Sequence, residues 1–284
     1  MNAAVTVFFL IIKVFSLYFL AVSLFGLCRR RTPEPAARLR RFAVLIAARN
    51  EESCIAGLIE SLRAQHYPPE LVDIWVLPNN CTDRTAEAAR RAGAQVLEMP
   101  ASVRSKGAAL HTAAKALLRS TRNYDAFCVF DADNEADPAF LSEMNRALDR
   151  TAIVKSRILA KNRTQAGISA CYEIYFCSAN HFLNRAREAM GLSARVIGTG
   201  FAIRRDLLET LDGFPCRTLT EDAELYAACL CRGARIGYCE TAVTYDEEPV
   251  TWRASLVQRR RWMSGILQVA RLTLPELLAN FLRQ

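Results

Sequence analysis

Several patterns that mark common protein classes are missing from these 284 residues. No Cys-x-x-Cys pair occurs among the ten cysteines, so their spacing indicates no zinc site, and most of them lie in apolar runs as small buried hydrophobes would. The first strand–helix turn reads ARNEE without Gly-x-Gly-x-x-Gly, which argues against a dinucleotide-dependent oxidoreductase. No stretch interleaves basic with aromatic residues, so no nucleic acid partner is expected. Internal repeats and low-complexity tracts are also absent.

The N-terminus is apolar for long enough to cross a bilayer. Ala3 to Leu27 is 25 residues long and carries one charge, Lys13. A signal peptide would have a basic start and a shorter apolar region, and a core helix would show a polar face. Because Lys13 lies near the middle, an interfacial or re-entrant helix stays open as an alternative. The pattern favours one transmembrane anchor at 1–28.

Arginine dominates the segment that follows. The sequence CRRRTPEPAARLRR contains six arginines and one glutamate, which by the positive-inside rule predicts a cytoplasmic domain after a single span. This juxtamembrane linker (29–41) and QRRRW near the C-terminus account for much of the net charge of +8. Both suit anionic lipid head groups, and the membrane is therefore an expected partner.

Apolar and amphipathic segments then alternate, which predicts an α/β domain with a mostly parallel sheet flanked by helices. In the first part of the domain we expect strands at 42–48, 72–77, 94–99 and 124–131, with helices at 51–65, 82–92 and 106–120. The rest is less regular. There we expect helices at 138–149, 166–190, 219–233 and 251–272, strands at 152–159, 235–239 and 241–245, and a glycine-rich turn at 197–205.

The stretch FCVFDADNEAD (127–137) ends an expected strand in four carboxylates. Ligands of parallel sheets gather beyond the carboxyl ends of the strands, and crowded carboxylates repel one another unless a cation lies among them. An EF-hand loop does not fit, because Ala136 stands where glycine is needed and Ser142 where glutamate is needed. Solvated loop acids are the alternative to a Mg²⁺ or Mn²⁺ site that holds a diphosphate.

Five ordered motifs carry a family resemblance. They are VLIAARNEE (44–52), NNCTDRTAEAA (79–89), DAD (131–133), TED (220–222) and QRRRW (258–262). The chain resembles a family 2 glycosyltransferase of the membrane-bound inverting kind related to cellulose, chitin and hyaluronan synthases. The resemblance runs from Phe42 to Arg271 and implies a GT-A-like, Rossmann-related domain at 42–250, with an interfacial amphipathic helix and tail at 251–284.

On the donor side, the resemblance implies residues that bind the nucleotide diphosphate and a divalent metal. Ala47, Arg49, Glu51, Asn79, Lys106 and Asp131 match nucleotide-side positions, and Asp133, with Asp131, matches the metal ligands of the DxD motif. Many relatives carry aspartate where this chain has Asn79. A UDP-sugar is the favoured donor and Mg²⁺ or Mn²⁺ the cofactor, which would neutralise charge on the leaving diphosphate.

On the acceptor side, Asp222 of TED matches the base that takes a proton from the acceptor hydroxyl in an inverting transfer. Glu221 would hold it in place. Gly198, Thr199 and Gly200 resemble the turn beneath the acceptor. Gln258, Arg261 and Trp262 match the QxxRW positions, with Trp262 stacking on the acceptor sugar and Arg261 facing the diphosphate.

No apolar run long enough to span a membrane follows Trp262, so a processive synthase with its own channel is not expected. Two alternatives remain open: transfer of one or a few sugars to a saccharide or lipid-linked acceptor, or a truncated synthase that needs a membrane partner subunit. A membrane-tethered nucleotide-sugar binder without turnover would need Asp222 or the DxD motif to be lost, and both are present. Metal-dependent sugar transfer is the function that we expect.

Overall fold

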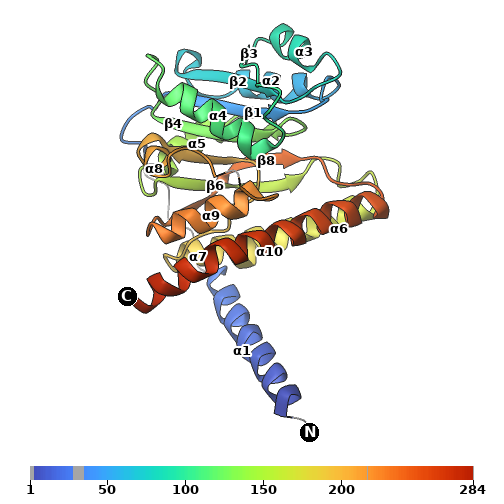
Figure 1. The fold of residues 1–284 in the computed structure, drawn as a ribbon, viewed down its shortest axis with the longest axis vertical. Helices are drawn as coiled ribbons and strands as arrows, with labels where there is room; N and C mark the ends of the chain where they lie inside the picture. The colour runs from blue at the N-terminus through green and yellow to red at the C-terminus, as the bar shows by residue number, and fades with distance from the viewer. Residues whose placement is uncertain (1–2, 28–34, 216, 284) are drawn as a thin grey trace.

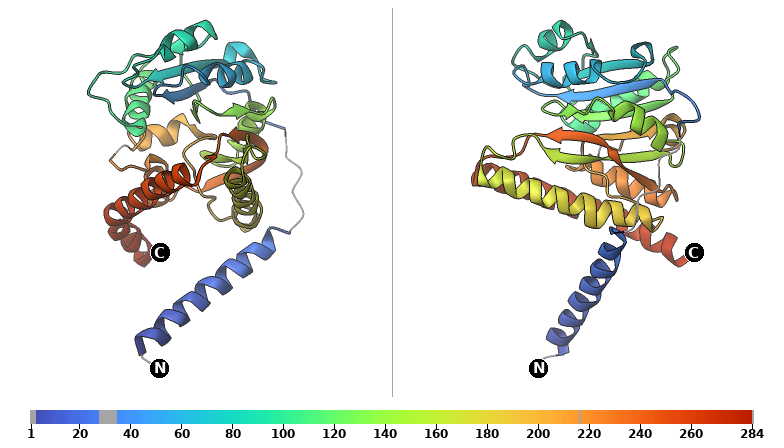
Figure 2. Two further views of the ribbon diagram at one scale, coloured as in Figure 1. Left: turned by 90° about the vertical axis from the view of Figure 1, so that its right-hand side faces the viewer. Right: turned by 180° about the vertical axis from the view of Figure 1, so that it is seen from behind.

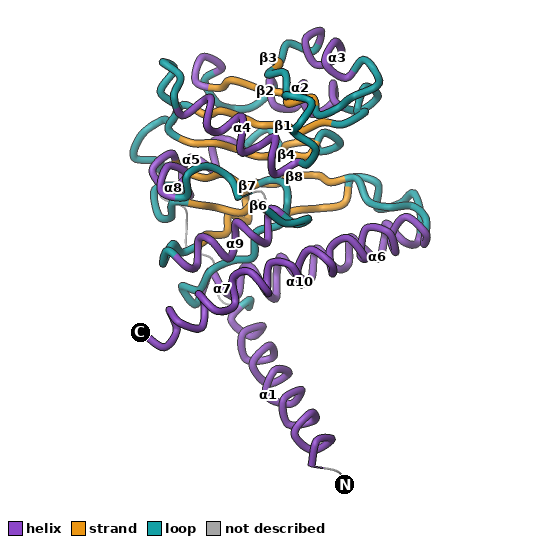
Figure 3. The backbone as a smooth tube through the Cα atoms, viewed as in Figure 1, coloured by secondary structure: helices purple, strands orange, loops and turns teal. Residues whose placement is uncertain are grey.

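The computed structural model describes residues 3–27, 35–215 and 217–283. One eight-stranded mixed sheet, in the order β3-β2-β1-β4-β7-β6-β8-β5, forms its centre (Figures 1 and 3). The strands are β1 (Phe42–Ala48), β2 (Val72–Pro78), β3 (Gln95–Val96), β4 (Ala126–Asp131), β5 (Glu135–Ala136), β6 (Ile153–Ala160), β7 (Phe201–Arg204) and β8 (Ile236–Asp246). The expected α/β class and the mostly parallel sheet are confirmed.

Helices cover both faces of this sheet. They are α2 (Ile55–Arg63), α3 (Thr85–Arg91), α4 (Lys106–Leu118), α5 (Phe140–Ala147), α8 (Arg205–Thr210) and α9 (Glu221–Cys231), with a short 3₁₀ helix η1 (Pro69–Leu71). Alternate residues of a strand point to opposite faces. In β1, Phe42, Val44 and Ile46 therefore pack with α2 and α5, whereas Ala43 and Leu45 pack with α4. The continuous apolar run of β1 reflects burial on both sides.

The first four strands in sheet order are parallel, and the order of β1 between β2 and β4 is as expected for βαβ units. In register, Ala48 pairs with Pro78 and Ala47 with Asp131, so the ends of three strands meet at one edge. Residues that follow these strands, including Asn79 and Asp133, therefore lie along the same edge of the sheet.

The second half of the sheet differs from expectation at two points. β7, which runs antiparallel to β4 and β6, occupies part of the segment 197–205 that was expected to be a turn. Residues 235–239 and 241–245 are not two strands but one strand, β8, whose pairing with β6 shifts register between Ser156 and Arg157. The irregularity absorbs the residues that separate the two apolar stretches.

In addition to the helices on the two faces of the sheet, a further set packs along one side of the α/β domain. α6 (Gly167–Ser178), the π-helical segment η2 (Ala179–Arg185) and α7 (Ala186–Ala189) together fill the expected helix at 166–190. α10 (Trp252–Arg283) is longer than expected. Tyr172 of α6 joins α10 through its hydroxyl, which is 3.0 Å from Ser255 Oγ and donates to Gln258 Oε1 at 2.9 Å. Helices α6 and α10 run along the same side of the domain (Figures 1 and 2).

Helix α1 (Ala3–Phe25) projects from this side, with its apolar surface exposed along most of its length (Figure 2). It is the one described helix that is long and apolar enough to span a membrane. Its base contacts η2 and α7. A side chain at Gly26 would lie 2.7 Å from the carbonyl oxygen of His181, so the close approach of the two segments requires glycine there.

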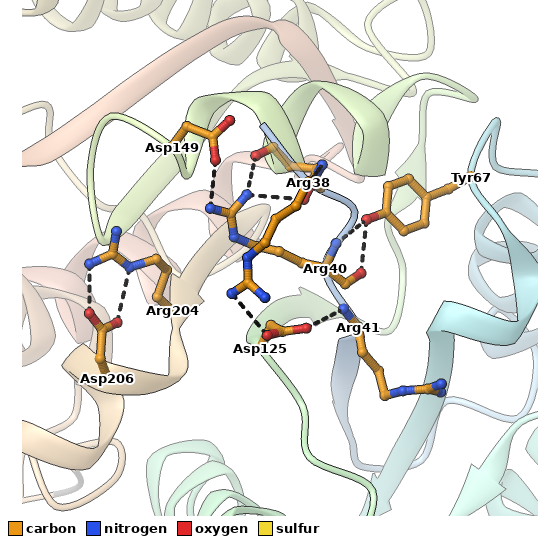
Figure 4. Close-up of polar contacts among 9 residues, drawn as sticks. Arg38, Arg40, Arg41, Tyr67, Asp125, Asp149, Arg204 and Asp206 are labelled. Atoms are coloured by element: carbon orange, nitrogen blue, oxygen red, sulfur yellow. Dashed lines mark hydrogen bonds and ion pairs between the residues drawn. The ribbon is translucent and has the colours of Figure 1, made fainter. Parts of the chain in front are cut away.

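The arginines that precede β1 are bound by the domain (Figure 4). Arg40 is buried and donates to the Asn145 carbonyl oxygen at 2.9 Å and to Asp149 Oδ1 at 2.6 Å, while Arg38 pairs with Asp125 at 3.0 Å. Nearby, Arg204 and Asp206 form an ion pair at 2.6 Å. Arg40 is therefore held by the domain and not available to lipid head groups, so at most the other linker arginines can serve the predicted membrane contact. Arg29 to Arg31 lie outside the described residues.

Candidate functional site

Two loops at the carboxyl edge of the sheet interlock. The loop after β1 carries Asn50, whose Oδ1 accepts from the Thr82 amide at 2.8 Å, and the Glu52 amide donates to Asp83 Oδ2 at 3.1 Å. The Glu51 amide donates to Thr85 Oγ1 at 2.9 Å. The helix expected from residue 51 begins only at Ile55, so Glu51 and Glu52 belong to this loop pair rather than to a helix.

The nucleotide-side residues predicted near these loops fall into two groups. Ala47 lies at the end of β1, and Asn79 follows β2 with its amide donating to the Ala48 carbonyl oxygen at 2.9 Å. Asn79 is buried, and its Oδ1 accepts from Asn80 Nδ2 at 2.8 Å. Arg49 is exposed at the rim. Backbone geometry thus fixes Ala47 and Asn79, while Arg49 points into solvent.

Lys106, at the first position of α4, joins the two separate acidic motifs. Its Nζ lies 2.5 Å from Asp131 Oδ1 and 3.2 Å from Glu221 Oε1, and it donates to the Gly198 carbonyl oxygen at 2.5 Å. Burial lowers the pKa of this amine, but Asp131 and Glu221 more than offset that effect and the net shift is upward. Residues that are 25 to 115 positions apart in the sequence therefore share one cation.

Asp222 lies beside the same lysine. A Cβ atom placed on Gly198 would be 3.3 Å from Lys106 Nζ, 3.8 Å from Asp222 Oδ2 and 3.8 Å from Glu221 Oε1. The pKa of Asp222 is raised by burial and by Glu221, and Lys106 opposes the rise. A carboxylate with a raised pKa is suited to accept a proton, and the bare Cα of Gly198 lets Lys106, Glu221 and Asp222 come close together.

The turn from Gly198 to Gly200 is tied to the DAD segment. Thr199 Oγ1 accepts from the Asp131 amide at 3.0 Å and is hydrogen-bonded to Asn134 Oδ1. Gly200 has a φ of 59°, and a Cβ atom on it would lie 2.5 Å from Thr244 Oγ1. Both the backbone conformation and the close hydroxyl require glycine at this position.

Asp133 was predicted as the metal ligand. Burial and the neighbouring Asp131 raise its pKa to about 7, which means that the ionised form lacks a counter-charge. Asp133 Oδ1 accepts from Asn134 Nδ2 at 3.3 Å, and no ion pair to this carboxylate occurs among the residues that the structure describes. Those residues contain no group of three His, Cys, Asp or Glu side chains that could hold a metal by themselves. One or two carboxylates with phosphate oxygens and waters are the ligand set that Mg²⁺ and Mn²⁺ accept, so the acids fit such an ion.

Two groups near the site, the half-buried Asp246 and the buried Lys155, were not predicted from the sequence. Asp246 ends β8 and accepts from Asn134 Nδ2 at 2.6 Å, and burial raises its pKa well above the usual range. Lys155 of β6 donates to the Gly200 carbonyl oxygen at 3.1 Å. An acid at the end of a strand was a usable signal for Asp246. Lys155 stands within an apolar strand and gave no such signal.

The QRRRW residues lie on α10 and belong to a separate contact network. Trp262 packs edge-on against Tyr172 with ring centroids 6.3 Å apart, in a small apolar cluster that includes Ile197, the residue before Gly198. Gln258 bonds Tyr172, as described above. Arg261 is exposed and, with Gln258 and Val257, borders a shallow depression that is open to solvent. The motif is thus near the predicted acceptor turn through Trp262, whereas Arg261 makes no described contact with Asp131 or Asp133.

Family comparison supports the resemblance that the motifs carry. The sequence model of the family described as "Glycosyltransferase like family 2" matches residues 40–265. The chain belongs to this family of glycosyltransferases. The matched segment contains the loops after β1 and β2, the DAD and TED motifs and QRRRW, so the whole cluster around Lys106 lies within it.

Curated relatives in the family are similar at modest identity. A probable glycosyltransferase, YdaM, of Bacillus subtilis is 28% identical over 244 residues, which are 82% of this chain and 56% of YdaM. The beta-monoglucosyldiacylglycerol synthase of Synechocystis is 26% identical over 233 residues, which are 78% of this chain and 47% of that protein. The chain thus spans about half the length of these relatives.

Solved structures share the fold. A mannosyltransferase of Pyrobaculum calidifontis, in complex with GDP-Man and Mn²⁺, superposes with a TM-score of 0.70 at 21% identity and covers 91% of this chain and 71% of its own. Glucosyl-3-phosphoglycerate synthase of Mycobacterium tuberculosis, solved with Mn²⁺ and UDP, gives a TM-score of 0.55 at 20% identity, with 81% and 78% covered. The GT-A-like fold predicted from the sequence is therefore confirmed.

Proposed function

We propose that this family 2 glycosyltransferase is an inverting enzyme that moves a sugar from a nucleotide-diphosphate sugar to a hydroxyl acceptor at the cytoplasmic face of a membrane. The observation that carries the proposal is the convergence on Lys106 of Asp131 from the donor edge and Glu221 from the acceptor side, with Asp222 beside them. Donor and acceptor chemistry can occur together only where both sets of groups meet.

The donor occupies the edge formed by the loops after β1, β2 and β4. Asn79 and the Ala47 backbone contact the base, and Lys106 exchanges part of its present contacts for the diphosphate. A UDP-sugar is the first candidate. Asp133, with Asp131, would hold a Mg²⁺ or Mn²⁺ ion, which neutralises negative charge on the departing diphosphate when it is bound. Solved relatives in fold carry Mn²⁺ with UDP or GDP-Man, in line with this assignment.

The acceptor hydroxyl approaches beside Gly198, within reach of Asp222. Its oxygen forms a bond to the anomeric carbon while the bond from that carbon to the diphosphate oxygen breaks and its electron pair leaves with the diphosphate. Asp222 takes the hydroxyl proton during the attack. Attack on the face opposite the leaving group inverts the anomeric configuration, and no covalent enzyme intermediate is needed.

The membrane orients the acceptor. Helix α1 serves as the single anchor, and the outward surface of α10, which exposes large apolar side chains, lies in the interface. These residues are Trp252, Leu256, Val257, Met263, Ile266, Leu267, Leu272, Leu274 and Leu278. A saccharide or lipid-linked acceptor would reach Gly198 from this side.

The test is nucleotide release by the purified full chain with a panel of UDP-, GDP- and CDP-sugars, with Mn²⁺ or with EDTA. Asp222→Asn should lower kcat by about 10²- to 10⁴-fold, because a general base contributes that much, while UDP binding with Mn²⁺ stays. Asp133→Asn should lose the metal dependence. Asp212→Asn, an exposed acid paired with Lys115, is the matched control. Metal-dependent binding without any turnover would favour a tethered nucleotide-sugar binder or a synthase that needs further segments, and no nucleotide binding would reject the proposal.

A further inference from the structure

Helix α10 faces the domain along a regular stripe. Buried or half-buried residues recur every three or four positions, which is the spacing of one helix face. They are Ser255, Gln258, Trp262, Gly265, Val269 and Thr273. The N-terminal part of the stripe meets Tyr172 of α6, and the middle meets α9. The same helix therefore touches both the acceptor-side cluster and the helix that begins with Glu221 and Asp222.

Gly265 is the point of closest approach to the TED motif. A Cβ atom on Gly265 would lie 2.4 Å from Thr220 Cγ2 and 2.5 Å from Thr220 Oγ1, closer than non-bonded atoms can come. Thr220 is 6% exposed, and its hydroxyl has no hydrogen-bond partner among the residues that the structure describes. The side chain of Thr220 is therefore held by packing against the bare backbone of α10 and not by a helix-capping hydrogen bond.

One turn further along, α10 makes a directed contact with the same segment. Gln268 Oε1 accepts from the Leu219 amide at 3.0 Å. On its other side, the segment is held by the fully buried Glu224, which accepts from the Arg217 and Thr218 amides at 3.0 Å each. Residues 217–220 thus lie between a fixed carboxylate of α9 and two residues of α10, directly before Glu221 and Asp222.

We infer that Gly265 and Gln268 are positioning residues that set the place of the Asp222 carboxylate relative to Gly198 and Lys106. The inference rests on the proposed function of Asp222. Packing at Gly265 fixes how closely Thr220 approaches α10, and the Gln268 hydrogen bond fixes the backbone one residue before it. Neither residue contacts Asp131, Asp133 or Lys106 in the described structure, so their effect on the reaction passes through the TED segment.

The first experiment compares Gly265→Ala with wild type in the full chain, in the nucleotide-release assay described above. The added methyl must displace Thr220, and a displacement of about 1 Å at a catalytic group costs about 100-fold in rate, so kcat should fall by about that factor. The KM for the donor and the Kd for UDP with Mn²⁺ should stay within about twofold. Gly57→Ala, in α2 with open space around its Cβ position, is the matched control.

A second variant makes the test specific. Thr220→Gly deletes all three atoms that would lie within 3 Å of the added methyl, and the deleted hydroxyl makes no hydrogen bond within the described part of the chain. In the Gly265→Ala/Thr220→Gly pair, kcat should therefore recover at least tenfold over Gly265→Ala alone. An unchanged kcat in Gly265→Ala would overturn the inference. A fall in kcat that is matched by weaker UDP binding and not recovered in the pair would also overturn it, since that pattern indicates a general packing defect.

Gln268→Met separates this inference from the function on which it rests. Loss of the acceptor should speed hydrogen exchange at the Leu219 amide about three- to tenfold, with amides of β1 unchanged, whether or not sugar transfer is seen. Turnover by the wild type with normal kcat in both α10 variants would reject the positioning role alone. No turnover by the wild type would reject the proposed function, while the exchange rates would still report whether α10 holds the segment.

Discussion

The two halves of the sheet place their polar groups differently. In β1, β2 and β4 the side chains within the strands are apolar except for Asp73 near the start of β2, and polar groups such as Asn79 and Asp131 come where the strands end. In β6 and β8 polar side chains are buried within the strands: Lys155, Ser156 and Thr244 are each at most 1% exposed. The first half thus has an apolar scaffold with its chemistry at the edge, and the second half has polar groups in its interior.

This difference follows from where the loops of the candidate site lie: at the strand ends in the first half, and against the strands themselves in the second. Parallel strands bring their carboxyl ends to one edge, so the edge that we propose for the donor is assembled by topology alone. The turn from Gly198 to Gly200 instead lies against the strands of the second half, and its carbonyl groups must be satisfied there. The Gly200 carbonyl oxygen accepts from the Ser156 amide at 2.9 Å and from Lys155 Nζ at 3.1 Å. The turn that we propose for the acceptor side therefore depends on buried polar partners.

The change that should alter stability most is the loss of a buried apolar side chain from the first half of the sheet. Phe130 of β4 is fully buried, with its ring 4.9 Å from that of Phe140. Phe130→Ala should lower the free energy of unfolding by about 3–5 kcal/mol, because it removes a large side chain and leaves a cavity. Urea denaturation in detergent measures this. Ile158→Ala, in the small cluster below the second half, should cost less, and an equal or larger cost there would mean that the halves do not differ in this way.

The sequence predicted the first half better because its signals are local. FAVLIAA and FCVF are apolar runs that end in polar residues, and both became strands with the expected edge. β7 was missed, because four residues after a Gly-Thr-Gly turn are too few to show a pattern and its neighbours in the sheet are distant in sequence. The meeting of Lys106 with Glu221 also depends on tertiary packing, and only the family resemblance placed both at one site.

Lys155 gives the next largest effect. Burial lowers the pKa of its amine from 10.5 to about 7, although Asp246, Asp222 and Asp131 oppose the shift. Between pH 7 and 10.5 the unfolded chain binds a proton that the folded chain does not, so this group makes stability rise with pH across that window. The cost in folding free energy of burying the charged amine is fully present below about pH 7, where it amounts to a few kcal/mol.

Lys155→Met should therefore raise the Tm near pH 7 and flatten the dependence of stability on pH between 7 and 10. The Gly200 carbonyl oxygen keeps its bond to the Ser156 amide in the variant. Thermal unfolding at several pH values measures both effects. Lys115→Met, at an exposed ion pair with Asp212, is the control and should leave the slope unchanged. A lower Tm, together with an unchanged dependence of stability on pH, would show that the amine is charged and stabilising in the folded protein. Burial of Lys155 would then carry no cost in stability, contrary to the comparison of the two halves.

The smallest effect concerns base recognition at the edge of the first half. The buried Asn79 can present either a donor or an acceptor to a base, because its amide carries both. Asn79→Asp would present acceptors alone, which match the N3–H donor of uracil but repel the N3 acceptor of cytosine. The ratio of UDP to CDP affinity should thus rise about tenfold, measured by calorimetry with Mn²⁺. Asn123→Asp adds the same charge outside the site and should not change the ratio. If Asn79→Asp leaves the ratio unchanged as well, the base is read by another part of the edge, and strand topology alone does not specify the nucleotide pocket.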